Sequence, residues 1–125
     1  MNVFKLFSIM SFFLSCNAHD PKFIRKEIIA NGIAVKWFFY SSITSFSPDI
    51  IEVSENRKIV EIFRAGDAIT DVAVDSNVIL VKLFEPYRGN VYTKPLPKRA
   101  FNHKIVFDTT ATIEEYQHIP IGKKE

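Results

Sequence analysis

Apolar and polar residues alternate with a period of two along much of the chain, which is the pattern of half-buried β-strands. The clearest example lies on both sides of Asn31-Gly32, where two such runs follow one another. Asn-Gly is the strongest short-range signal for a two-residue type I′ turn, because both central residues need a positive φ. The pattern therefore predicts a hairpin of two strands, residues 23–30 and 33–40.

This turn also predicts the register of the hairpin. One face is then nearly all apolar, whereas the other places Glu27 directly opposite Lys36, and such a cross-strand charge pair contributes about 0.2–1 kcal/mol. A slip of one residue would destroy both features. The predicted pairs are Ala30–Ile33, Ile29–Ala34, Ile28–Val35, Glu27–Lys36, Lys26–Trp37, Arg25–Phe38, Ile24–Phe39 and Phe23–Tyr40.

A second hairpin is predicted around Ser76-Asn77. In its register Asp71 lies opposite Lys82, and the other face pairs mostly apolar residues. The predicted pairs are Val74–Ile79, Ala73–Leu80, Val72–Val81, Asp71–Lys82 and Thr70–Leu83. Further strands are predicted at residues 49–54, 58–64 and 104–108, with a turn at 85–90 and an extended, proline-containing segment at 94–98.

Two segments leave alternatives open. Ser47-Pro48-Asp49 has the form of a helix start, but the β-branched residues that follow favour a strand. Residues 110–118 fit a short helix, because Thr112 and Glu115 match a capping box, and they fit an edge strand as well.

Together these elements predict an all-β fold. About seven to nine short strands, separated by turns, are typical of an antiparallel β-sandwich or a small barrel, here with room for one short C-terminal helix. The chain has 125 residues and contains no internal repeat. This length suits a single domain, which the pattern places at residues 23–125.

Composition excludes several classes of protein. The chain is 47% hydrophobic and 24% charged, and it has one Cys, so it is neither a disulfide-stapled scaffold, a multi-cysteine zinc module nor a disordered tail. Its 16 Lys and Arg against 14 Asp and Glu give a net charge of +2, which is too balanced to indicate a nucleic-acid partner.

The first residues have the form of a secretory signal peptide. Lys5 is the only charged residue before His19, and it is followed by a run of nine residues, 6–14, of which seven are apolar. A helix needs about 20 such residues to span a bilayer, so this run is too short for a membrane span and has the length of a signal core. We expect a signal peptide at residues 1–15.

The segment Phe13-Leu14-Ser15-Cys16 resembles the lipobox of bacterial lipoprotein signal peptides. The resemblance implies that Cys16 is lipidated on its sulfur and becomes the new N-terminus of a small cell-envelope lipoprotein, with residues 16–22 as its tether. Asn17 in place of Asp favours the outer membrane or its periplasmic side. Two alternatives remain: cleavage after Ala18, which would release a soluble secreted or periplasmic protein, and an uncleaved buried segment with a structural cysteine.

No motif for catalysis, phosphate binding or metal binding is present. The chain lacks Gly-x-Ser-x-Gly and any glycine-rich loop, and His19, His103 and His118 are not spaced as metal ligands. We therefore predict no catalytic residue, no metal and no cofactor. Asp67, Asp71 and Asp75 recur every fourth residue, but on a strand they lie about 13 Å apart and cannot share one cation.

A basic stretch with aromatic neighbours is the candidate interaction surface. It comprises Tyr87, Arg88, Tyr92, Lys98 and Arg99. The leading hypothesis is a non-catalytic binding, inhibitor or assembly module, anchored to the membrane by lipid, whose partner is an unidentified envelope protein or glycan.

Two further hypotheses give different structural expectations. A small secreted hydrolase of cell-wall or glycan substrates would need a cleft with two converging acids or a His–acid pair. A subunit that completes its sheet by strand exchange could use the apolar strand around residues 37–40, which would then lie at a sheet edge.

Overall fold

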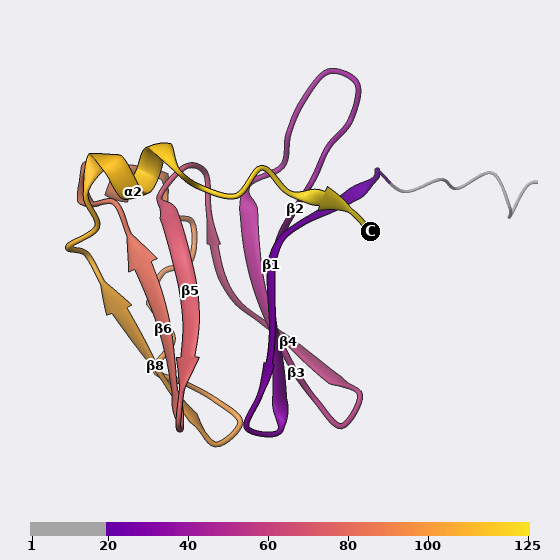
Figure 1. Ribbon diagram of the computed structural model, residues 1–125, viewed down its shortest axis with the longest axis vertical. Helices are drawn as coiled ribbons and strands as arrows, with labels where there is room; N and C mark the ends of the chain where they lie inside the picture. Colours follow the sequence, from indigo (N-terminus) through magenta and orange to yellow (C-terminus); the bar gives the residue numbers. More distant parts are fainter. Residues whose placement is uncertain (1–19) are drawn as a thin grey trace, which may run out of the picture.

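The computed structural model describes residues 20–125 and contains two β-sheets packed face to face (Figure 1). One sheet has the strand order β4-β3-β2-β1-β9 and the other β5-β6-β8-β7, which confirms the predicted all-β, sandwich-like fold. In chain order the elements are β1 (Lys22–Ala30), β2 (Ile33–Tyr40), β3 (Asp49–Glu55), β4 (Lys58–Ala65), β5 (Ile69–Asp75), β6 (Val78–Leu83), the 3-10 helix η1 (Glu85–Asn90), β7 (Arg99–Ala100), β8 (His103–Asp108), α2 (Ile113–Gln117) and β9 (Lys123–Lys124).

The β1–β2 hairpin turns at Asn31-Gly32, as predicted, with φ of 52° and 81° at the two residues. Its predicted register is confirmed for the five pairs from Ala30–Ile33 to Lys26–Trp37. The outer three predicted pairs are wrong, because a β-bulge at Arg25 shifts the register by one residue. The observed outer pairs are Ile24–Phe38, Phe23–Phe39 and Lys22–Tyr40.

The β5–β6 hairpin shows the same combination of a correct inner register and a bulge near its open end. The pairs from Val74–Ile79 to Asp71–Lys82 are confirmed. The predicted pair Thr70–Leu83 is wrong, since Ile69 lies opposite Leu83 and Thr70 is the extra residue. The Thr70 hydroxyl donates a hydrogen bond of 3.3 Å to the carbonyl oxygen of Lys82, which satisfies it inside the fold.

The three further predicted strands are confirmed as β3, β4 and β8, whereas the two-residue strands β7 and β9 were not predicted. Both open alternatives are resolved. Residues 49–55 form a strand rather than a helix, whereas residues 113–117 form the short helix α2. The capping box of α2 is complete: the Thr112 side chain accepts a hydrogen bond from the Glu115 backbone N–H, and the Glu115 carboxylate accepts one from the Thr112 N–H.

One strand pairing is parallel. β6 pairs with β8 in parallel register, whereas every other named strand pair among residues 20–125 is antiparallel. The connection from β6 to β8 contains η1 and β7 and is long enough for the crossover that a parallel pair requires. Sequence periodicity reports which face of a strand is buried but not the direction of its neighbour.

The core lies between the two sheets. Trp37 from one sheet is 0% exposed, and Phe63 packs against Phe107 of the other sheet with ring centroids 5.0 Å apart. β2, which contains residues 37–40, lies between β1 and β3. The strand-exchange hypothesis is therefore wrong for this strand, because both of its edges are paired.

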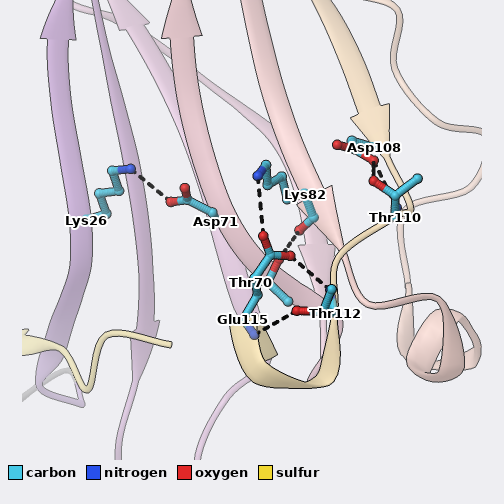
Figure 2. A network of polar contacts seen from close by, with 8 residues as sticks. All are labelled: Lys26, Thr70, Asp71, Lys82, Asp108, Thr110, Thr112 and Glu115. Atoms are coloured by element: carbon cyan, nitrogen blue, oxygen red, sulfur yellow. Dashed lines mark hydrogen bonds and ion pairs between the residues drawn. The ribbon is translucent and has the colours of Figure 1, made fainter. Parts of the chain in front are cut away.

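Polar contacts between β1 and β5 join the two sheets, and others connect α2 to the second sheet (Figure 2). Lys26 on β1 and Asp71 on β5 form an ion pair of 2.8 Å across the sandwich. Lys82 on β6 reaches Glu115 of α2 at 3.7 Å, so the capping residue of the helix also contacts the sheet. No helix within residues 20–125 has the length and apolar character of a membrane span.

Candidate functional site

A cleft of about 700 Å³ opens at the end of the sandwich where β2 leads into β3 and the C-terminal segment returns to β1. We call this end, formed by the start of β1, the loop of residues 41–48 and residues 119–125, the cleft end (Figure 1). Most of the lining of the cleft is apolar and comes from Phe23, Phe39, Phe46, Ile69, Ile119 and Ile121.

A buried carboxylate lies at the base of the cleft. Asp49, the first residue of β3, is 7% exposed, and its Oδ2 accepts a hydrogen bond of 2.8 Å from Nε1 of Trp37. Arg25 Nε lies 2.8 Å from the same oxygen, as an ion pair whose N–H is not directed at the carboxylate. Burial raises the pKa of Asp49 above its ordinary value, although Arg25 and Trp37 act in the opposite direction.

Arg25 connects three parts of the site. The β-bulge turns its side chain toward Asp49, and its guanidinium carbon lies 4.3 Å from the ring centroid of Phe39, within cation–π distance. Its Nη1 donates a hydrogen bond of 2.7 Å to the carbonyl oxygen of Pro120. The bulge that the hairpin pattern does not predict is thus the feature that builds the base of the cleft.

The opening of the cleft carries large exposed apolar side chains. Phe39 stacks on Phe23 with centroids 5.5 Å apart and meets the edge of Phe46 at 6.0 Å. Phe46 is 76% exposed and Ile121 is 89% exposed, and both line the cleft. Exposed apolar side chains that gather at a concave site are typical of a binding surface.

The C-terminal segment forms one wall. β9 pairs with the start of β1, and Gly122, with φ of 99°, precedes it. A Cβ at this position would lie 3.0 Å from a ring carbon of Phe39, so the close approach of this segment to the aromatic wall requires glycine.

Two further titratable groups line the same cleft. Asp67, in the turn between β4 and β5, is exposed, and Tyr116 of α2 has its pKa raised, chiefly by desolvation. Arg25 and Asp49 were not predicted as site residues, and Asp67 was considered only as a cation ligand. The only sequence signal near them is the helix-like Ser47-Pro48-Asp49 start, and no local pattern links it to Arg25.

The predicted interaction surface is divided between two parts of the molecule. Tyr87 and Arg88 lie together on η1, where Tyr87 packs against Tyr116 and Arg88 pairs with Glu85 at 3.2 Å. Tyr92 follows η1, is 60% exposed, and donates its backbone N–H to the carbonyl oxygen of Arg64 in β4.

The two basic residues of this surface lie elsewhere. Lys98 and Arg99 lie at β7, where Arg99 is opposite Lys104, and the backbone of Lys104 bonds to Asn77 at the β5–β6 turn. Tyr87 instead follows the other end of β6. The structure therefore does not bring the five residues together. Arg88 also lines a second cavity of about 580 Å³ with Lys94, Leu96 and Phe107.

The histidines and acidic residues singled out in the sequence form no metal site within residues 20–125. His103 is buried, and His118 contacts the backbone oxygen of Glu114 through Nδ1 at 2.7 Å. Asp71, the middle residue of the acidic series, is paired with Lys26. His19, the signal peptide and Cys16 lie outside the described residues.

Comparison of the chain with protein-family models, curated proteins and solved structures gives no match. The cleft is therefore the described feature that bears on function. Its apolar opening can bind the apolar part of a ligand, and the Asp49–Arg25 pair and Asp67 can orient polar groups of that ligand.

Proposed function

We propose that this protein is a lipid-anchored cell-envelope protein whose β-domain is a non-catalytic binding module, with the cleft as its binding site. The observation that carries the proposal is the apolar opening, in which Phe46 and Ile121 are exposed above the partly buried Asp49–Arg25 ion pair. The ligand is then largely apolar or amphipathic, part of an envelope protein or glycan. The anchor is Cys16, on the outer membrane or its periplasmic side.

The contacts of Asp49 support binding over catalysis. Its Oδ2 is already held by Trp37 and Arg25, and Arg25 is itself held by Phe39 and Pro120. A carboxylate fixed in this way keeps the base of the cleft in one geometry, which lowers the cost of binding a ligand to a preformed site.

The cleft is tested with a fluorescent apolar probe, 1-anilinonaphthalene-8-sulfonate. We expect saturable binding to the wild-type protein and weaker binding to Phe46→Ser, because this change removes an exposed wall of the cleft. Ile59→Ser is the matched control, since Ile59 is 65% exposed on β4 and does not line the cleft. Equal loss of probe binding in both variants would contradict the assignment of the site.

The partner is sought by placing a photo-cross-linking amino acid at position 46 or 59 of the protein in its native cells. A cross-linked product specific to position 46 supports the proposal and identifies the bound molecule. The same products from both positions, or none from position 46, would argue against a ligand in the cleft.

The anchor is tested by Cys16→Ala and membrane fractionation. We expect the wild-type protein in the membrane fraction and the variant in the soluble fraction, with a lipid adduct on Cys16 detected by mass spectrometry. A variant that stays in the membrane fraction would refute anchoring at Cys16. A mature N-terminus at His19 would instead establish the soluble form cleaved after Ala18.

A small hydrolase of cell-wall or glycan substrates is the second candidate. It is favoured by Asp49 and Asp67 lining one cleft, with the pKa of Asp49 raised by burial, as a general acid requires. A hydrolase would release soluble fragments from purified cell wall, and Asp67→Asn would abolish the release. The binding proposal expects no release by the wild-type protein.

A further inference from the structure

The cleft end carries apolar side chains that no part of the described chain covers. Ile43 is 104% exposed at the tip of the loop of residues 41–48, and Phe46 and Ile121 are 76% and 89% exposed beside it. Burial of such side chains is favourable, so the isolated domain leaves this hydrophobic free energy unused.

This exposure is held by a defined loop structure. The base of the loop is closed by two hydrogen bonds of 2.8 Å, from the Ser47 N–H to the Tyr40 carbonyl and from the Tyr40 N–H to the Ser47 hydroxyl. At the tip, the Ser42 N–H bonds to the Ser45 carbonyl at 2.8 Å, which forms a tight turn around Ile43. The fold therefore presents Ile43 outward.

The same end is the place from which the chain leads back toward Cys16. Ser41, at the base of the loop, donates its N–H to the Pro21 carbonyl at 3.0 Å, and Glu125 donates its N–H to the Lys22 carbonyl at 2.9 Å. Figure 1 shows the loop extending beyond the start of β1 and β9. The loop, the C-terminal segment and the start of β1 are thus neighbours.

The length of the tether decides which end of the domain an anchor holds. Cys16 and Lys22 are six residue steps apart, so the extended chain between them reaches about 21 Å. β1 has nine residues and is about 30 Å long, which places the Asn31-Gly32 turn at the far end of the sandwich. A lipid on Cys16 would keep the cleft end, and not the hairpin turns, next to the bilayer.

Charge at this end suits phospholipid headgroups. Lys123 and Lys124 are exposed directly after Ile121 and Gly122 and make no ion pair with a described residue. The neighbouring acid, Glu125, already contacts lysines of the first sheet. Lysines near an anionic bilayer surface strengthen membrane binding through electrostatic attraction to the headgroups.

We infer that the cleft end is a membrane-contacting surface, in which Ile43, Phe46 and Ile121 enter the bilayer interface and Lys123 and Lys124 contact anionic headgroups. This inference rests on the proposed membrane anchor. It also places the opening of the cleft at the lipid surface, so that the molecule it binds is delivered from the membrane.

The test uses the depth of single positions in vesicles of phosphatidylethanolamine and phosphatidylglycerol. The full chain with Cys16→Ala carries either Ile43→Cys or Ile29→Cys, labelled with an environment-sensitive fluorophore. Ile29 is the matched control, because it is an 80% exposed isoleucine near the hairpin turn of β1. We expect a blue shift and quenching by spin-labelled lipids for the label at position 43 but not for that at position 29.

A second arm uses the membrane-anchored protein, in which lipid on Cys16 leaves the engineered cysteine as the only free thiol. Quenching at position 43 in this form supports the inference, even where the unanchored chain binds too weakly. An anchored protein without quenching at position 43, or with equal quenching at position 29, overturns the inference and leaves the anchor intact.

The protein with Cys16→Ala tests the surface even if the lipid anchor is refuted. If fractionation refutes the anchor, quenching of the Cys16→Ala chain at position 43 still establishes the surface, and its absence overturns it. Photo-cross-linking of position 43 to a protein instead of to lipid would show that a protein partner covers this surface, and it would overturn the inference.

Discussion

Replacing Asp49 tests whether its carboxylate holds the base of the cleft. Two variants separate its roles: Asp49→Asn keeps an oxygen that can accept the hydrogen bond from Trp37, whereas Asp49→Ala removes it. In Asp49→Ala the indole N–H of Trp37, a residue that is 0% exposed, loses its acceptor. An unsatisfied buried donor costs about 1–3 kcal/mol. We therefore expect the alanine variant to be less stable than the asparagine variant by this amount.

The dependence of stability on pH adds a second expectation. Burial raises the pKa of Asp49 in the folded state, so the folded protein holds this proton more tightly than the unfolded chain does. The contribution of Asp49 to stability is therefore fully present below the pKa of the unfolded state and is lost as the pH rises through the folded pKa. Asparagine does not titrate, so the stability of Asp49→Asn relative to wild type should improve between about pH 3 and about pH 7.

Thermal unfolding followed by Trp37 fluorescence measures both effects, at acidic and at neutral pH. At neutral pH we expect the Tm of Asp49→Ala to be at least about 3 °C below that of Asp49→Asn. Comparing wild type with each variant at the same pH isolates the effect of replacing Asp49. Equal stability of the two variants would refute the role of the Trp37 hydrogen bond. A loss of relative stability of Asp49→Asn on going to neutral pH would refute the raised pKa.

Three further predictions concern the scaffold of the domain. Gly32→Ala should lower the free energy of unfolding by about 1–2 kcal/mol, and because no atom would contact the new Cβ, this cost comes from the φ of 81° alone. Gly89→Ala is the control, since its Cβ would also meet no atom and its φ is not positive, and thermal unfolding compares the two variants. Thr112→Ala should lower the stability of α2 by about 0.5–2 kcal/mol, because it removes the N-cap of this helix. Amide hydrogen exchange in α2 should become faster, and unchanged exchange would contradict the capping box. A double-mutant cycle of Lys26→Ala and Asp71→Ala should give a coupling of about 1 kcal/mol or less, since both side chains are more than a third exposed, and a much larger value would show that the pair is shielded from solvent.

Local sequence patterns were sufficient for the seven longer strands and for the inner halves of both hairpins, but not for the two-residue strands β7 and β9. Asn31-Gly32 and Ser76-Asn77 place the turns, and a period-two pattern then assigns each residue to a face. The capping box at Thr112 likewise indicates the start of α2. These features depend on residues a few positions apart, which is why the sequence alone determines them.

The cleft was decided only by the tertiary structure. Arg25 lies at the bulge that interrupts the hairpin register, and there it contacts Asp49 and Pro120. These partners lie 24 and 95 positions further along the chain, so no local pattern indicates them. The parallel pairing of β6 with β8 also depends on long-range packing. Alternation along a strand reports burial, but it carries no information on which distant segment provides the burial, so neither the bulge nor the site that it builds can be read from local pattern.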